Sequence, residues 1–407
     1  MKNWKQKSIA KIYLDYASLT PTDKRVSAVV ADYEKAEREG KYGNPSSIYA
    51  AGVAAKKALE QARTVCAQSI HTHSDEIIFT GGGTEANNLA ILGVVEATRK
   101  NYKDIHIIVS AIEHTSVMET VFALQKKGVH LDILPVKQNG VVDLEILKRL
   151  LRPTTVLVSV MMVNNEIGTI QPIADIVKIV RDFRKLNSRN FPLIHTDACQ
   201  ALLYMDINLE KLGVDLLSAD SNKIYGPRSV GMLYVRRSAA TLIEPISFGG
   251  GQEKGLRAGT ENVAGIVGFA KAIEIAAAER ESEVARLTVL RDYCIKKLHT
   301  NIPNLTVNGD PIEHIANNIN VSILHIDHEF LVLELDVRGI SCSTKSACLR
   351  DSDESYVLKA LHADAHDQSA PQQASQSLRI SLGRFTSKKD IDYLIKTLTR
   401  LVIRDYN

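Results

Sequence analysis

Polar side chains follow five short apolar runs of this chain, in each case at the point where the run ends. The polar groups lie at residues 81–84, 113–114, 164–166, 197–200 and 220–223. Ligands of an open parallel sheet bind in the crevice outside the carboxyl ends of its strands. The five groups are therefore predicted to converge on one pocket, and the alternative is that they are only capping and turn residues.

Two of these residues could carry covalent and electrostatic chemistry. Lys223 follows an apolar run, where a lysine is costly to bury unless it has a function. An amine in a low-dielectric pocket loses its proton more readily and can form a Schiff base; the alternative is a surface lysine in a loop. Asp197 ends another run. It either caps a helix or pairs with a cation in the pocket, as a carboxylate does beside the ring nitrogen of pyridoxal 5′-phosphate (PLP).

Residues 81–84, Gly-Gly-Gly-Thr, open a predicted helix that extends to about residue 98. Small residues let backbone N–H groups approach an anion, and a helix N-terminus favours negative charge. The segment indicates a phosphate site or, equally, a glycine-rich helix cap. It lacks the Gly-Lys-Ser/Thr of a P-loop, and no dinucleotide fingerprint follows any run, which argues against a nicotinamide-dependent dehydrogenase.

The apolar runs that must position these groups indicate an α/β fold. They lie at 76–80, 105–110, 155–160, 192–196, 214–218 and 231–235, and helical patterns separate them. Continuous apolar runs between helices are typical of strands buried on both faces of a mostly parallel sheet. A long helical pattern from Val263 to about His299 then leads to a mixed series that indicates a smaller α+β domain. Its strand-like parts lie at 317–322 and 378–382, and its helical parts at 329–336 and 388–404.

The composition is that of a globular protein with a large core. The chain has 407 residues, of which 45% are hydrophobic and 24% charged, with a net charge of +3. The charges of both signs are interspersed, so direct binding to nucleic acid is not expected. The basic first residues are not followed by an apolar run, and no stretch is long enough to span a membrane, so we expect a cytoplasmic protein. Neither a disulfide framework nor a metal site is expected from the five cysteines.

Motifs spread over nearly the whole chain resemble those of one family. They are Tyr-Leu-Asp-Tyr-Ala at 13–17, Gly-Asn-Pro-Ser-Ser at 43–47, Phe-Thr-Gly-Gly-Gly-Thr-Glu-Ala-Asn-Asn-Leu-Ala at 79–90, Val-Asn-Asn-Glu-Ile-Gly at 163–168, Lys-Ile-Tyr-Gly-Pro at 223–227, Arg-Ala-Gly-Thr at 257–260, Ser-Ala-Cys at 346–348, Ser-Tyr-Val-Leu at 355–358 and Arg-Ile-Ser-Leu-Gly-Arg-Phe at 379–385. The chain resembles PLP enzymes of the class V aminotransferase family, and within it the cysteine desulfurases of the IscS/NifS type.

The resemblance implies fold type I of the PLP-dependent transferases, with a mostly parallel sheet of the seven-stranded type and a smaller α+β domain. It predicts an N-terminal segment at 1–22 that packs with the small domain, a large PLP-binding domain at 23–265, and a small domain at 266–407 that carries the nucleophile loop.

The resemblance also implies a role for each matching residue. Lys223 would bind PLP as a Schiff base, and Asp197 would pair with the ring nitrogen. Gln200 would hydrogen-bond the ring hydroxyl, and His114 would stack on the ring and move protons at the substrate. The other implied cofactor contacts are Gly83, Thr84, Asn165, Asp220, Asn222 and, from the neighbouring subunit of a homodimer, Thr260. The implied substrate contacts are Asn165, Arg379 and, close by, Asn44.

The sequence departs from the family pattern beside the lysine. A histidine normally precedes the Schiff-base lysine, and here that residue is Asn222. Asp220 stands where a phosphate-binding serine is usual. A carboxylate there would repel phosphate unless it turns away, so we expect the phosphate to be held differently from the family norm.

Cys348 is the predicted nucleophile. It is flanked by Lys345 and Arg350, which could depress the pKa of its thiol, and Ser-Ala-Cys at 346–348 matches the family motif. The remaining cysteines are predicted to be structural or small buried side chains: Cys66, Cys199, Cys294 and Cys342.

The implied reaction converts L-cysteine to L-alanine and leaves the sulfur as a persulfide on Cys348. The sulfur would pass to an acceptor protein of an iron–sulfur cluster or tRNA-thiolation pathway. One alternative is another class V PLP enzyme, such as a selenocysteine lyase or an aminotransferase; an aminotransferase would not need Cys348. A second alternative is a degenerate, non-catalytic sulfur-relay homologue, which Asp220 and Asn222 would favour.

Overall fold

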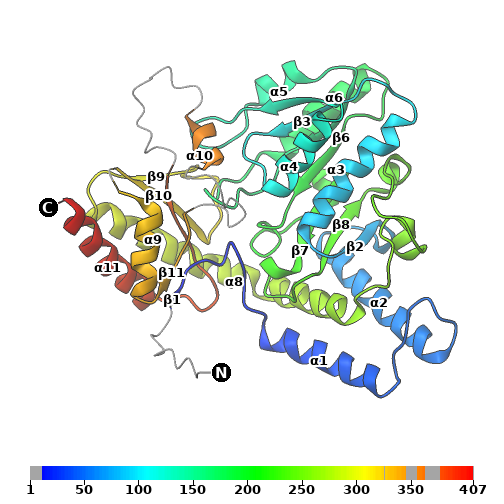
Figure 1. Ribbon diagram of the computed structural model, residues 1–407, viewed down its shortest axis with the longest axis horizontal. Coiled ribbons are helices and arrows are strands. Elements are labelled where there is room, and N and C mark those ends of the chain that lie inside the picture. The colour runs from blue at the N-terminus through cyan, green and yellow to red at the C-terminus, as the bar shows by residue number, and fades with distance from the viewer. Residues whose placement is uncertain (1–11, 325, 345–354, 363–375, 407) are drawn as a thin grey trace.

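A seven-stranded sheet runs through the larger part of the molecule (Figure 1). The computed structural model describes residues 12–324, 326–344, 355–362 and 376–406. In spatial order the strands are β2 (Ile77–Thr80), β8 (Gly231–Val235), β7 (Leu216–Asp220), β6 (Leu193–Asp197), β5 (Thr155–Ser159), β3 (His106–Ser110) and β4 (His130–Leu134). β8 is antiparallel to both of its neighbours, and the other pairs are parallel. The predicted, mostly parallel sheet is confirmed.

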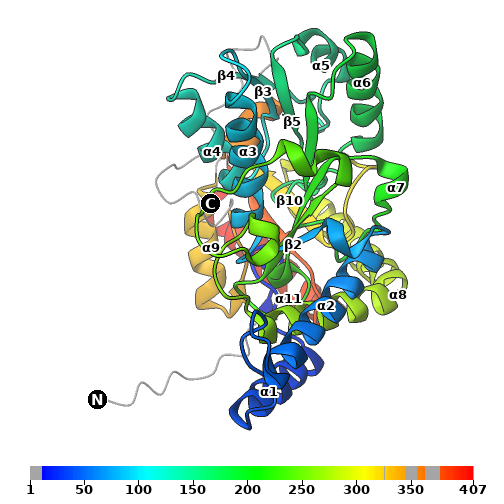
Figure 2. The ribbon, with the colours of Figure 1, turned by 90° about the vertical axis from the view of Figure 1, so that its right-hand side faces the viewer.

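Both faces of this sheet are buried, because successive residues of a strand enter different hydrophobic cores. In β3, Ile108 packs in one core, while Ile107 and Val109 pack in the other. The second core also contains residues of α3 (Gly83–Arg99) and α4 (Thr115–Gln125), and the first contains residues of α6 (Ile173–Leu186). In Figure 2, α3 and α4 accordingly lie on one side of the strands and α6 on the other.

The strand β4 is the one member of this sheet that the apolar runs did not predict. It lies at the sheet edge and pairs with β3 alone. Its residues alternate irregularly between exposed and buried, and Ile133 is 39% exposed. An edge strand need not be apolar throughout, so it carries no continuous apolar run.

The smaller part of the molecule contains a three-stranded antiparallel sheet in the order β12 (Leu378–Ser381), β10 (Asn318–Ile323) and β9 (Leu305–Val307). The helices α9 (His328–Val337) and α11 (Lys388–Tyr406) contact each other beside this sheet. The short strand β1 (Ile12–Tyr13) pairs with β11 (Ile340–Ser341), so the chain immediately after residue 11 lies against this part. The remaining α-helices are α1 (Lys24–Arg38), α2 (Ala50–Ser69), α5 (Leu144–Leu150), α7 (Leu209–Leu212) and α10 (Tyr356–Leu361).

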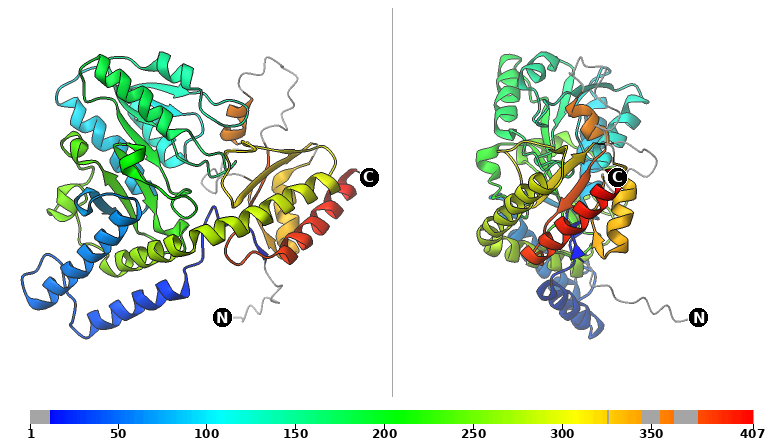
Figure 3. Two further views of the ribbon diagram at one scale, coloured as in Figure 1. Left: turned by 180° about the vertical axis from the view of Figure 1, so that it is seen from behind. Right: turned by 90° about the vertical axis from the view of Figure 1, so that its left-hand side faces the viewer.

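The helix α8 (Val263–Asn301) connects the two parts, as the left view of Figure 3 shows. It packs on α1 and α2 and also on α11, β9 and β10. The predicted division into 1–22, 23–265 and 266–407 stays a prediction, since α8 runs without a break past residue 265. No helix in the described part of the chain is both long and apolar enough to cross a membrane.

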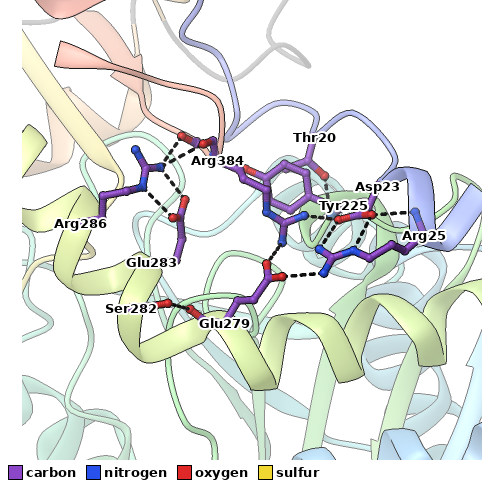
Figure 4. Close-up of polar contacts among 10 residues, drawn as sticks. Thr20, Asp23, Arg25, Tyr225, Glu279, Ser282, Glu283, Arg286 and Arg384 are labelled. Carbon is purple, nitrogen blue, oxygen red and sulfur yellow. Dashed lines mark hydrogen bonds and ion pairs between the residues drawn. The ribbon is translucent and has the colours of Figure 1, made fainter.

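An ionic cluster around Arg384 joins the small part to the rest of the molecule (Figure 4). The Arg384 guanidinium forms ion pairs with Asp23 and, at 2.8 Å, with Glu279 of α8. It also lies 4.4 Å above the ring of Tyr225, whose hydroxyl accepts the Arg384 backbone N–H at 2.7 Å. Tyr225 follows Lys223 by two residues. This cluster therefore connects the turn after β12 to the segment that contains Lys223.

Replacement of Arg384 by alanine is expected to lower the free energy of unfolding by about 2 kcal/mol, because half-buried carboxylates lose a charged partner. Arg25 is the matched control. It pairs with the same two carboxylates, but its side chain is 51% exposed, against 17% for Arg384. Arg25→Ala should cost less than about 1 kcal/mol. Urea unfolding of both variants measures the difference, and equal losses would contradict the role given to Arg384.

Candidate active site

One pocket lies at the carboxyl edge of the seven-stranded sheet. Each of the five polar groups contributes at least one lining residue, so the predicted convergence is confirmed. Ala17 and Ser18 of the N-terminal segment and Arg379 of β12 line the pocket from the side of the smaller part of the molecule. The lining residues are Ala17, Ser18, Gly83, Thr84, Asn87, His114, Ser116, Met161, Asn165, Asp197, Cys199, Gln200, Asp220, Asn222, Lys223 and Arg379.

Lys223 ends a short 3₁₀-helix, η2 (Ser221–Lys223), that directly follows β7. Its amine donates hydrogen bonds to the backbone oxygens of Ala17 at 3.0 Å and Ser18 at 2.5 Å. Burial lowers the pKa of this amine, although the nearby Asp220 acts in the opposite direction. Gln200 donates to the same Ala17 oxygen at 2.9 Å. The N-terminal segment thus holds both residues on one wall of the pocket.

Asp197 is the last residue of β6 and is 5% exposed. Its carboxylate accepts hydrogen bonds from the Asn87 side chain at 2.7 Å and from the backbone N–H of Cys199 at 2.9 Å. It is therefore held in a fixed orientation by two donors. Sequence reasoning gave Asn87 no role, yet the residue lies three positions after Thr84 on the predicted helix, a spacing that places both on one helix face.

His114 is the N-cap of α4, and its ring is oriented by the helix that it caps. Its Nδ1 accepts the backbone N–H of Ser116 at 3.1 Å and lies 2.8 Å from the Ser116 hydroxyl. Asn87 donates to that hydroxyl at 2.9 Å. Because Nδ1 accepts a backbone hydrogen bond, the neutral ring carries its proton on Nε2. Asn87 and Ser116 thus link His114 to Asp197, a connection that the sequence did not reveal.

The start of α3, where a phosphate site was predicted, is occupied by a carboxylate. Asp220 does not turn away: its Oδ2 accepts the backbone N–H of Gly83 at 2.8 Å, and its Oδ1 accepts that of Asn222 at 2.8 Å. Glu85 accepts the N–H of Gly81 at 2.6 Å and is paired with Arg257 at 3.0 Å. Two amides at this helix end therefore already have carboxylate partners.

Arg379 approaches the pocket from β12 and is 1% exposed. It donates to the backbone oxygen of Asn165 at 3.1 Å, to the Ser18 hydroxyl at 2.7 Å and to Asp15 at 2.9 Å. Its Nε is buried without a hydrogen-bond partner among the described residues. A buried guanidinium that retains an unsatisfied donor suits a carboxylate ligand.

Two predicted contacts lie outside this pocket. Asn44 is exposed, and its side chain accepts the backbone N–H of Ser46 at 2.9 Å. Thr260 is also exposed. Their chain neighbours Pro45, Ser46 and Glu261 line a second pocket. The roles of Asn44 and Thr260 stay predictions.

The cysteines differ in burial. Cys66, Cys294 and Cys342 are buried, as predicted, and burial raises the pKa of each thiol to about 12. Cys199 is only half-buried and lines the pocket, which corrects the expectation of a buried side chain. Its pKa is also raised, first by desolvation and then by the charges of Asp197 and Asp220. The predicted nucleophile, Cys348, lies outside the described residues.

Glu113, next to His114, is a fully buried acid that contacts the pocket residue Met161. One oxygen accepts hydrogen bonds from the Ser110 hydroxyl at 2.5 Å and from the backbone N–H of Met161 at 2.7 Å. The other oxygen has no partner among the described residues. Burial, with a further contribution from the charge of Asp197, raises the pKa of Glu113 to about 8.

This raised pKa predicts a pH-dependent difference between the protein and its Glu113→Gln variant. The folded state holds the proton more tightly than the unfolded state, whose glutamate pKa is about 4.3. The stability contributed by the protonated group is therefore complete below about pH 4, and it is lost as the pH rises through about 8. The variant should gain stability relative to the parent over that interval in urea unfolding. A difference that is constant with pH would contradict the assignment.

The residues of the pocket fit the ring of PLP. The pocket contains the buried carboxylate of Asp197, the amine of Lys223 with its lowered pKa, and the amide donor of Gln200. The phosphate end offers a helix N-terminus, as phosphate sites do. There, however, the Asp220 carboxylate holds the Gly83 amide, so the phosphate fits when that carboxylate is neutralised.

Comparison with known proteins assigns the chain to a family. The model of the aminotransferase class-V family matches residues 12–394, and the chain belongs to this family. Its relatives include proteins named cysteine desulfurase IscS. The chain is 43% identical to cysteine desulfurase IscS of Dictyoglomus turgidum, covering 96% of this chain and 94% of the relative. It is 40% identical to a probable mitochondrial cysteine desulfurase of Dictyostelium discoideum, covering 97% and 83%.

Solved structures give the same result. A NifS-like protein is 34% identical, with a TM-score of 0.86 over 97% of this chain and 100% of that chain. A structure of SspA in complex with cysteine is 31% identical, with a TM-score of 0.75 over 92% and 99%. The predicted fold type and the resemblance to IscS/NifS cysteine desulfurases are confirmed.

Proposed function

We propose that this protein converts L-cysteine to L-alanine and transfers the sulfur atom to Cys348. In this reaction the C–S bond of the substrate breaks and an S–S bond to Cys348 forms. The electron pair of the C–S bond stays with carbon, which takes up a proton, and the Cys348 thiol becomes a persulfide. The observation that carries the proposal is that Lys223, Asp197 and Arg379 meet in one pocket.

The cofactor proposed for this pocket is PLP, which supplies an electron sink when a proton leaves the substrate Cα. Lys223 would bind it covalently and then exchange the proton at Cα, a task that suits an amine of lowered pKa. Asp197 would keep the ring nitrogen protonated, since its carboxylate is fixed by Asn87 and Cys199. Gln200 would donate to the ring hydroxyl, and His114 would lie against the ring.

Arg379 is proposed to bind the substrate carboxylate, with Asn165 beside it. The guanidinium is held from two sides by Asp15 and by the Asn165 backbone, so it is oriented before the substrate arrives. Preorganisation of this kind lowers the entropic cost of placing the substrate at the reacting atoms.

Cys348 is proposed as the sulfur acceptor because the chain on both sides of it is attached to pocket residues or to their direct neighbours in the chain. Ser343 exchanges backbone hydrogen bonds with Arg379 itself. Ser355 donates to the carboxylate of Glu166 at 2.6 Å, and Tyr356 donates to the backbone oxygen of Glu113. The four described cysteines all have raised pKa values, which disfavour the nucleophilic thiolate.

A homodimer is proposed in which Thr260 reaches the cofactor of the neighbouring subunit and Asn44 lies near its substrate. The exposed apolar side chains near these residues support it: Ile48 is 97% exposed and Phe248 is 89% exposed. Tyr49 and Val53, next to Ile48 in the chain, are also exposed, at 58% and 56%, and neighbouring exposed apolar groups are a feature of surfaces that another protein covers. We also propose that the persulfide sulfur passes to an acceptor protein of an iron–sulfur or tRNA-thiolation pathway. A cytoplasmic location is proposed for the protein.

The experiment that tests the function supplies the protein with PLP, L-cysteine and a thiol reductant and measures L-alanine. Alanine should form with L-cysteine, and L-serine, which has the same shape but no sulfur, is the control. If the protein binds PLP yet forms no alanine, the proposal is wrong. Transfer of the amino group to an added 2-oxo acid would favour the aminotransferase alternative instead.

A further inference from the structure

The carboxylate of Asp220 occupies the anion-binding end of the proposed cofactor pocket. It is 8% exposed and lies at the junction of β7 and η2. Its Oδ2 takes the Gly83 amide, which is the first N–H of α3. A helix of 17 residues presents partial positive charge at this end. Asp220 therefore uses the donor that a bound phosphate would need.

The other charged groups around Asp220 do not offer a phosphate a strong counterion. Lys223 on η2 is the residue proposed to bond with the cofactor. Beyond β6, Asp197 adds negative charge and Cys199 a thiol of raised pKa. On α3, Glu85 is already paired with Arg257. An ionised Asp220 would therefore face a phosphate dianion with little compensation.

We propose that Asp220 binds the cofactor phosphate as a neutral carboxylic acid, so that cofactor binding takes up one proton from solvent at this side chain. The protonated oxygen then donates to the phosphate, and the phosphate takes over the Gly83 amide. The direction of the Asp220 pKa agrees, because burial raises it even against the two amide donors and Lys223. This inference rests on the proposed use of PLP and specifies how this chain tolerates an aspartate where serine is usual.

The test compares PLP binding to the full-length protein and to its Asp220→Asn variant at several pH values. Asparagine keeps the shape and can still accept the Asn222 amide, so the fold of η2 is preserved. Titrating groups that do not interact with Asp220 affect both proteins equally and cancel in the ratio. Lys223, whose pKa burial lowers and the charge of Asp220 raises, would affect the binding of pyridoxal in the same way as that of PLP. At high pH the variant should bind PLP more tightly than the parent. The ratio of the two affinities should rise by up to about tenfold for each pH unit. At low pH the two affinities should converge.

Two further measurements separate this inference from simpler explanations. Titration calorimetry in buffers of different ionisation enthalpy should count one proton more for the parent than for Asp220→Asn. Pyridoxal, which lacks the phosphate, should bind both proteins alike. Asp220→Ser, which restores a hydroxyl that can also cap η2, should behave like Asp220→Asn.

Each outcome has a distinct meaning. Equal proton counts, or a variant that binds PLP no more tightly at high pH, would overturn the role of Asp220 and leave the proposed function intact. A gain that pyridoxal shares would also overturn it, since the effect would not depend on the phosphate. If neither protein develops the absorbance of a PLP–lysine adduct at any pH, the proposed function itself is wrong, and this inference with it.

Discussion

Replacement of Lys223 by alanine is expected to abolish formation of alanine from L-cysteine, with a loss of at least about 10³-fold. The reason is that one amine would both hold the cofactor and exchange the proton at the substrate Cα. Burial lowers its pKa, and two backbone oxygens orient it in the pocket. Alanine production, measured at saturating PLP, reports the loss.

The absorbance spectrum separates this role from a structural one. Lys223→Ala should also lose the visible band that PLP shows when it is bound to a lysine amine, while its unfolding transition in urea stays cooperative. Lys211→Ala, at an exposed lysine of the same sheet domain, is the control and should change neither activity nor spectrum. If Lys223→Ala retains the band, another amine binds the cofactor and the assignment is wrong.

Replacement of Asp197 by asparagine is expected to reduce turnover on the order of 10² to 10³-fold, because a preorganised charge at the ring nitrogen is removed. The substitution changes almost no volume. In the parent protein, Asn87 donates to the Asp197 carboxylate at 2.7 Å. The substitution therefore places two side-chain amides opposite each other. Part of any effect could therefore be a lost hydrogen bond.

The exchange of these two residues distinguishes charge from hydrogen bonding. In the double variant Asn87→Asp, Asp197→Asn, the hydrogen bond is restored with its polarity reversed, and the negative charge moves from β6 to α3. Stability in urea should return toward that of the parent, whereas turnover should stay low. Recovery of turnover together with stability would show that Asp197 acts only through its hydrogen bond.

Much of the pocket could be predicted because its residues follow buried strands. β6 and β7 are continuous apolar runs, and Asp197 and Lys223 follow directly at their carboxyl ends. Parallel strands bring such positions to one edge of the sheet, independently of the conformation of the connecting loops. The edge strand β4 was missed for the converse reason, because two of its five residues are exposed and it carries no apolar run.

The residues that were missed act through their neighbours. Asn87 contacts Asp197, and Ser116 contacts His114. Asn87 stands within the motif at 79–90 but was given no role, and Ser116 belongs to none of the quoted motifs. The position of Asp220 in the chain indicated a conflict with phosphate, but only the structure showed that its carboxylate faces the Gly83 amide. Thr260 and Asn44 are exposed and do not line the pocket of this chain, and their predicted roles stay predictions.

The most direct test of the account is mass spectrometry of the protein after incubation with PLP and L-cysteine in the absence of a reductant. The account predicts a gain of one sulfur atom on the peptide that contains Cys348, together with an equal amount of L-alanine. A Cys348→Ser variant should show neither. Sulfur on a different cysteine, or alanine formed by Cys348→Ser at the parental rate, would contradict the account.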